Sequence, residues 1–178
     1  MTIQNLMKVL PPPAAPTYTF DGPWEPIEAE LGTPLPQDYK DFARIYGDGH
    51  FWECLALFMP NAPGDYGLLL PNAYERQTFF VREHPSVRMF PQPGGLLACG
   101  SVDVGLTLFW LTRGPPSEWP IVVWEHRGGE GEEAELFECD LTDFIAGVVG
   151  GTIDPRAFPS GLELDEPEQI FVPTEVRD

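Results

Sequence analysis

Apolar residues recur at helical spacing early in the chain. Residues 24–32 read as a short helix that Gly32 can end in a left-handed conformation. A second helix is predicted over residues 35–46, because Leu35, Tyr39 and Phe42 fall on one side of a helical wheel. The two predictions together place a helix pair at the start of the folded region.

The pattern then changes to short apolar runs separated by turn residues. Residues 51–58 predict a strand, and Asn72 is expected to cap a third helix that stops before Pro85. Four further strands are predicted from runs of period two or of continuous apolar residues, at Leu96–Cys99, Val104–Leu111, Ile121–Trp124 and Leu136–Phe137. Asp140 should cap a final helix that ends at Gly150 and Gly151.

This order of elements predicts an α+β fold. Sequential strands joined by short connections favour an antiparallel sheet, with the helices packed mainly on one face. We expect three regions along the chain: a Pro-rich arm over residues 1–20, one domain over residues 21–154, and an acidic, irregular tail over residues 155–178. The arm could be ordered in part by docking on the domain.

The net charge of the chain constrains the kind of partner it can bind. The chain has 178 residues, of which 28 are acidic and 10 are Lys or Arg, so its formal net charge is -18. Such a surface repels nucleic acid phosphates and anionic lipid head groups and attracts basic proteins. We therefore expect a protein partner, with no direct contact to nucleic acid or membrane, and a protein that is a monomer or a weak homodimer.

The cysteines and the apolar segments indicate a cytoplasmic protein. Cys54, Cys99 and Cys139 are odd in number and widely spaced, which is typical of reduced core cysteines and not of a disulfide framework. The first ten residues lack the continuous apolar stretch of a signal peptide. No segment approaches the roughly 18 apolar residues that a membrane span requires.

Residue patterns of catalysis are missing from the sequence. His50, His84 and His126 stand in no metal-ligand spacing, and Ser101 lacks the Gly-x-Ser-x-Gly context of a hydrolase nucleophile. The glycine pairs read as turns and not as a phosphate cradle. We therefore expect no enzyme, no metal and no cofactor.

A binding surface is the remaining interpretation. Protein interfaces draw affinity from aromatic anchors, and matched charge around them speeds encounter. Trp119 lies between prolines in a turn and is expected to be the most exposed tryptophan. The candidate contact residues are this anchor and a set of acidic residues, namely Asp48, Glu53, Trp119, Glu125, Glu130, Glu132 and Glu133.

Four blocks of residues suggest a family. The first comprises Trp24, Ile27, Glu28, Leu31, Gly32, Leu35, Pro36, Asp38, Tyr39, Lys40 and Phe42, followed by Tyr46-Gly47-Asp48-Gly49. The later blocks comprise Gly100, Asp103, Gly105, Phe109 and Trp110, then residues 120–123, then Phe144. In this order the blocks resemble the motifs of the SUKH superfamily, from about residue 24 to residue 150.

The resemblance implies an α+β fold and a function in protein binding. Most bacterial members are immunity proteins that bind and block a cognate toxin of a polymorphic or contact-dependent system, often a nuclease, whereas fungal relatives regulate cell-wall synthesis. The first hypothesis is thus an immunity protein that meets a basic toxin domain with an acidic surface. A non-catalytic regulatory or scaffolding module is the alternative, and a small-molecule binder or enzyme with a pocket between sheet and helices is the third.

Overall fold

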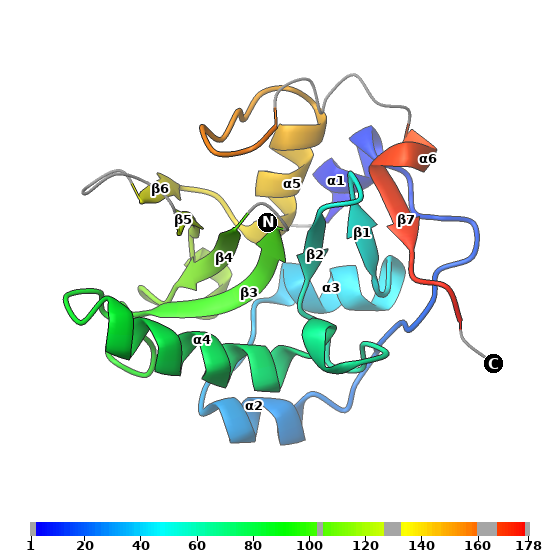
Figure 1. Ribbon diagram of the computed structural model, residues 1–178. Coiled ribbons are helices and arrows are strands. Elements are labelled where there is room, and N and C mark those ends of the chain that lie inside the picture. Colours follow the sequence, from blue (N-terminus) through cyan, green and yellow to red (C-terminus); the bar gives the residue numbers. More distant parts are fainter. Residues whose placement is uncertain (1–2, 103–104, 127–132, 160–166, 177–178) are drawn as a thin grey trace.

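A seven-stranded antiparallel sheet organises the chain (Figure 1). The computed structural model describes residues 3–102, 105–126, 133–159 and 167–176. The strand order is β6-β5-β4-β3-β2-β1-β7, so the first six strands form a meander and the last returns to pair with β1. The strands are β1 (Gly49–Phe51), β2 (Leu55–Leu57), β3 (Leu96–Val102), β4 (Leu106–Leu111), β5 (Ile121–Glu125), β6 (Ala134–Phe137) and β7 (Phe171–Pro173).

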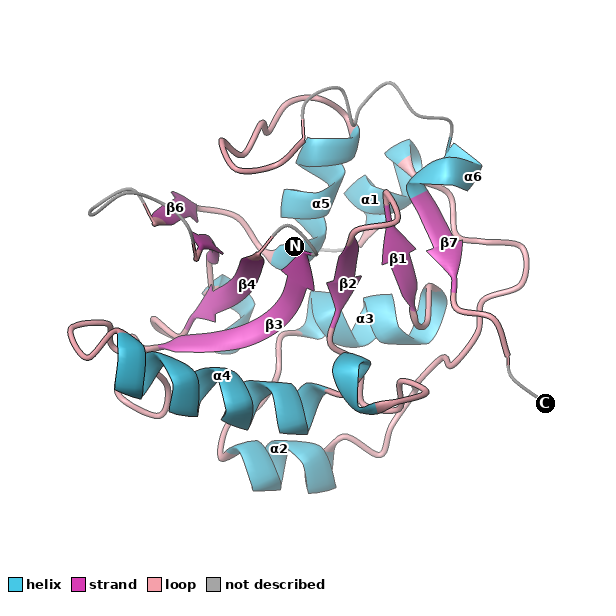
Figure 2. Ribbon diagram, in the orientation of Figure 1, coloured by secondary structure: helices cyan, strands magenta, loops and turns pink. Residues whose placement is uncertain are grey.

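Helices lie on both faces of this sheet (Figure 2). They are α1 (Gln4–Val9), α2 (Glu25–Leu31), α3 (Gln37–Ile45), α4 (Leu69–Glu83), α5 (Leu141–Val149) and α6 (Pro167–Ile170), with short 3-10 turns at Asp65–Gly67 and Pro116–Glu118. Helices α1, α3 and α5 form one layer, in which α5 contacts the other two. Helix α4 runs along β3 on the opposite face. The predicted α+β fold with an antiparallel sheet is confirmed.

Side chains along β4 point alternately to the two faces of the sheet, so this strand packs against helices on both sides. Trp110 packs against Tyr39 of α3, with ring centroids 5.1 Å apart. The preceding residue, Phe109, points to the other face of the sheet. Its ring centroid lies 5.1 Å from that of Phe80 in α4. Both faces of the central strands are therefore buried, which is why they read as continuous apolar runs.

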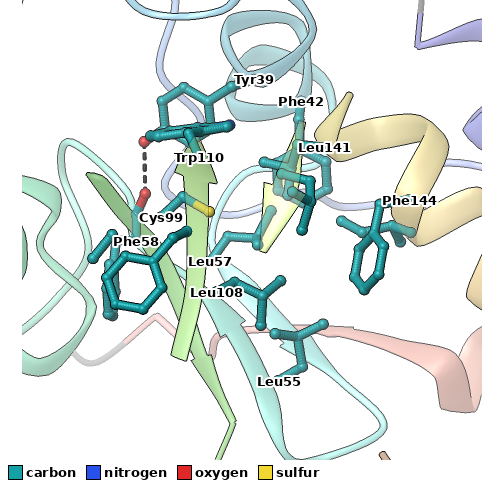
Figure 3. Close-up of a cluster of buried hydrophobic side chains, with 14 of the residues drawn as sticks. Tyr39, Phe42, Leu55, Leu57, Phe58, Cys99, Leu108, Trp110, Leu141 and Phe144 are labelled. Carbon is teal, nitrogen blue, oxygen red and sulfur yellow. Dashed lines mark hydrogen bonds between the residues drawn. The ribbon is translucent and has the colours of Figure 1, made fainter. Parts of the chain in front are cut away.

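The core between the sheet and the α3–α5 layer is aromatic and aliphatic (Figure 3). The Tyr39 hydroxyl is buried in this core and donates a hydrogen bond of 2.6 Å to the Phe58 carbonyl. Cys99 is fully buried at a bulge where the β3–β4 register shifts between Ala98 and Gly100. All three cysteines are free thiols, as the sequence predicts.

Two element predictions are wrong in detail. Residues 51–58 do not form one strand, because the chain reverses after Phe51 and returns as β2, so this segment is a hairpin. Helix α4 begins at Leu69, and Asn72 therefore lies inside its first turn. The buried Asn72 amide donates to the carbonyls of Asp65, Tyr66 and Leu68, so it fixes the preceding turn and does not cap the helix.

The two ends of the chain contain regular structure that the sequence did not indicate. Helix α1 packs on α5 with Leu6 fully buried, and the Asn5 amide donates to Asp143 at 2.9 Å. The expectation of an irregular tail is wrong for β7, which pairs with β1 through Phe51 and Phe171. Both ends thus contribute to the core of the described structure.

Candidate functional site: the acidic turn end of the sheet

The meander brings several distant acidic residues to one end of the sheet. In the register of the strands, Leu55 pairs with Val102, Val102 with Leu106, and Leu106 with Glu125. The β1–β2 turn, the β3–β4 turn and the β5–β6 connection therefore all lie at the same strand ends. Neighbouring strands are about 4.8 Å apart, so β2 and β5 are separated by about 15 Å. We call this edge, with Glu53, Glu125 and Glu133, the acidic turn end.

The β1–β2 turn holds Glu53 at the surface. Trp52 and Glu53 both have positive φ, 50° and 58°, and the Cys54 amide donates to the Phe51 carbonyl at 3.0 Å. Two successive left-handed residues match the twist of a tight hairpin turn, although non-glycine residues adopt this conformation rarely. The Trp52 side chain is buried against Phe51, while Glu53 is exposed. The buried ring anchors the turn that presents the carboxylate.

Glu125 and Glu133 come together at the β5–β6 end. The Glu125 amide donates to the Glu133 carbonyl at 2.7 Å, which makes them a cross-strand pair. Both residues are partly exposed. Like charges directly opposite each other on a sheet are unfavourable unless cations offset them.

His126 lies beside this end on the face covered by α4, with Arg76 and His84 nearby. His126 shares a hydrogen bond of 2.9 Å with the Thr107 hydroxyl, and its ring packs 5.6 Å from Phe80. Burial lowers the pKa of His126, and the nearby Arg76 and His84 lower it further. At neutral pH this histidine is neutral, so it leaves the negative charge of Glu125 in place.

Asp48 does not join this site. It precedes β1 and so lies at the end of that strand opposite Glu53. Its carboxylate is buried and accepts a hydrogen bond of 2.6 Å from the Thr174 hydroxyl, while its amide donates to the Thr17 carbonyl. Burial raises the pKa of Asp48 above its ordinary value. Asp48 ties the N-terminal arm and the chain after β7 to the first strand.

The prediction that Trp119 is exposed is wrong. Its side chain is 3% exposed and packs 6.3 Å from Trp110, and its indole N–H donates to the Gly114 carbonyl at 3.1 Å. The 3-10 turn at residues 116–118 folds the ring back over the end of β4. This connection also lies at the sheet end away from the acidic turn end. Glu130 and Glu132 lie outside the described residues.

Two of the three thiols are poor nucleophiles, because burial keeps them protonated. Burial raises the pKa of Cys139 to about 11 and that of Cys99 well above its ordinary value, so both thiols stay protonated. Among the described residues, no group of three His, Cys, Asp or Glu side chains could hold a metal ion.

An apolar pocket of about 220 Å³ lies between α2, α4 and the start of β3. Leu31, Ala73 and Leu97 contribute to its wall, and the Gln77 amide beside it donates to the Phe90 carbonyl at 2.7 Å. This pocket faces away from the acidic turn end. None of the helices in the described residues is both long and apolar enough to cross a bilayer.

Comparison with known proteins identifies the family. No curated protein matches the chain. The profile of the SMI1 / KNR4 family (SUKH-1) matches residues 23–147, which run from the start of α2 into α5. The match leaves out α1 at one end of the chain and α6 and β7 at the other. Because it covers more than half of the sequence, the chain belongs to the SMI1 / KNR4 family (SUKH-1).

Proposed function

We propose that this protein is an immunity protein that binds and neutralises a cognate toxin through the acidic turn end. Membership of the SUKH-1 family supports this proposal, because its members are immunity proteins or regulatory modules of the SMI1 / KNR4 type and are generally not catalytic. Immunity proteins of this kind act by binding a protein partner. The distribution of charge supports the choice of the surface that engages the partner.

Charge favours a basic partner domain. The formal net charge of -18 creates a field that attracts cations over long range and raises the rate of encounter. A nuclease toxin carries Lys and Arg side chains where it holds phosphates, and the carboxylates of Glu53, Glu125 and Glu133 can occupy the same positions. Glu130 and Glu132 belong to the same stretch of sequence and remain part of this proposal.

Deletion of the N-terminal arm would not separate an immunity function from a scaffolding function. A scaffold that uses the Pro-rich arm would lose its partner when residues 1–20 are deleted. However, Leu6 and Leu10 are buried in the core, so the same deletion would also remove core contacts. Point substitutions on the surface are therefore the appropriate test.

An assay of cell growth in the presence of a toxin tests the proposal. A candidate toxin domain would be expressed together with the wild-type chain or with a variant that carries Glu53→Gln, Glu125→Gln and Glu133→Gln. We expect the wild-type chain to restore growth and the variant to protect poorly. A variant with Glu25, Glu30 and Glu75 changed to Gln is the matched control, because these carboxylates are exposed on α2 and α4. Full protection by the acidic-turn-end variant would contradict the proposed surface.

A further inference from the structure

The two edges of the sheet are protected to different degrees. At one edge the Pro-rich arm lies beside β7, since residues 11–15 line a groove together with Phe171 and Pro173. Pro173 also lacks a backbone N–H, so it offers no donor to an incoming strand. The edge formed by β7 is covered by the chain itself.

The opposite edge, β6, keeps backbone groups that point away from the sheet. Among the described strands, β6 pairs only with β5. The Glu125 amide bonds to the Glu133 carbonyl, which shows that the backbone groups of Glu133 face β5. Orientation alternates along an antiparallel strand, so the N–H and C=O groups of Ala134 and Leu136 face outward. An outward row of this kind is a template for another strand.

The side chains of β6 alternate in chemistry as well as in direction. Ala134 and Leu136 are exposed on the face that α4 covers, because Ala134 pairs with Trp124 and Trp124 packs 5.1 Å from Phe80. Leu136 is 46% exposed, which is unusual for a leucine on an edge strand. Glu133 and Glu135 alternate with these residues on the other face, where the Glu135 carboxylate accepts a hydrogen bond of 3.0 Å from the Arg156 amide and lies 3.5 Å from its guanidinium.

The acidic residues decide which strand this edge can accept. Two copies of the chain, each with a formal net charge of -18, repel each other at this edge. An extended segment with Lys or Arg at alternate positions is instead attracted by this charge, and it meets Glu125 on one face of the sheet and Leu136 on the other.

We infer that the partner adds an extended segment of alternating basic and apolar residues to β6, as an eighth strand of the sheet. This inference rests on the proposed function and specifies how the toxin domain is held. The basic side chains of the segment lie on the face of the sheet that presents Glu125, and an apolar side chain covers Leu136. The main-chain hydrogen bonds form with Ala134 and Leu136.

A peptide probe tests the inference on the full chain. A short synthetic peptide of alternating Lys and Val is titrated into the isotope-labelled protein, and amide shifts and hydrogen exchange are followed by NMR. We expect shifts centred on β6 and slower exchange of the Ala134 and Leu136 amides. The same peptide with N-methylated alternate amides should lose binding, because it cannot complete the ladder. Equal binding of the methylated peptide, or shifts centred elsewhere, would overturn the inference.

Two substitutions extend the test to the protein. Leu136→Pro removes an outward N–H that β5 does not use, and Leu136→Lys places a cation against the incoming basic segment. Both should abolish peptide binding. The matched control is Val172→Lys on β7, since Val172 is 45% exposed. Binding of the peptide to Leu136→Lys as tightly as to the control would overturn the inference, and this outcome does not depend on whether Leu136→Pro folds.

The toxin domain separates this inference from the proposed function. If Leu136→Lys leaves toxin affinity unchanged while the Gln substitutions at the acidic turn end weaken it, strand addition is wrong and the proposed function stands. If neither change affects toxin affinity but the peptide still protects the β6 amides, the proposed function fails and the edge remains a strand-binding site.

Discussion

Among single residues, Asp38 has the least favourable environment for a charge. It lies at the start of α3, where burial raises its pKa to about 6 and the nearby Asp140 adds to the rise. The Thr142 amide at the start of α5 donates to its carboxylate at 3.0 Å and partly opposes this shift. Asp38 and Asp140 therefore place two acidic groups where two helices begin, and their charge costs stability at neutral pH.

The sign of the pH dependence follows from this raised pKa. The folded state binds the Asp38 proton more tightly than the unfolded chain, in which the ordinary value is 3.8. The resulting stabilisation is complete below the unfolded value and is lost as the pH rises through 6. A protein with Asn at this position keeps an acceptor for Thr142 and cannot ionise.

We therefore expect Asp38→Asn to raise the free energy of unfolding by about 1–3 kcal/mol at about pH 7.5, and by much less at about pH 4. Urea unfolding of both proteins at the two pH values measures this difference. An increase of the same size at both values would show that ionisation of Asp38 is not the cause.

The secondary-structure elements differ in how well the sequence predicts them. The helices α2 and α3 and the strands β3 to β5 could be predicted because their apolar spacing is regular and Gly32 ends α2 at a φ of 81°. Strand β7 could not, because it has three residues, ends in Pro173 and follows an acidic segment. Its pairing depends on Phe51 and Phe171, which are far apart in sequence.

The candidate site was predicted in part. The acidic residues of the turns could be identified from the sequence, whereas the strand order that places Glu53 and Glu125 at the same end of the sheet comes from the structure. The burial of Asp48 and Trp119 could not be predicted, because it depends on contacts with Thr174 and Trp110 that only the folded chain creates. The exposed edge of β6 was also missed, since sequence spacing does not reveal which strand ends the sheet.

Helix α1 belongs to the folded unit, so its buried side should matter for stability. Leu6 is fully buried, whereas Val9 on the same helix is 39% exposed. We expect Leu6→Ala to lower the free energy of unfolding by about 2–4 kcal/mol, because it leaves a cavity against α5. The control Val9→Ala should cost less than about 1 kcal/mol. Similar values for the two variants in urea unfolding would show that the arm is not part of the core.

The pairing of β7 with β1 depends on a glycine. A side chain at Gly49 would come within 2.5 Å of the Phe171 ring and 2.6 Å of the Val172 carbonyl oxygen. We expect Gly49→Ala to cost about 1–3 kcal/mol, because β7 must shift to make room. Faster amide exchange at Val172, measured by NMR, would locate the effect. Unchanged exchange and stability would contradict this pairing.

At the scale of the whole molecule, charge is the dominant property. Ion pairs such as Arg113–Glu138 at 2.7 Å and Arg156–Glu135 at 3.5 Å neutralise few of the acidic groups, since the chain has 28 of them and only 10 Lys and Arg. Self-repulsion of this kind destabilises the compact state and is screened by salt. The same excess of negative charge is what a basic partner would neutralise.

We expect the melting temperature to rise by several degrees between about 0.02 M and 0.3 M NaCl, because the Debye length falls below the spacing of many surface charges. Differential scanning calorimetry at constant pH measures this change. A melting temperature that falls with added salt would show that favourable ion pairs outweigh the repulsion.

Affinity for the toxin domain as a function of salt tests the central claim most directly. The dissociation constant would be measured at low and high NaCl for the wild-type chain, for the variant with Gln at positions 53, 125 and 133, and for the control variant with Gln at positions 25, 30 and 75. An acidic turn end that contacts basic side chains predicts weaker binding and a smaller salt dependence for the first variant, and values near wild type for the control. Equal affinity and equal salt dependence in all three proteins would contradict the account.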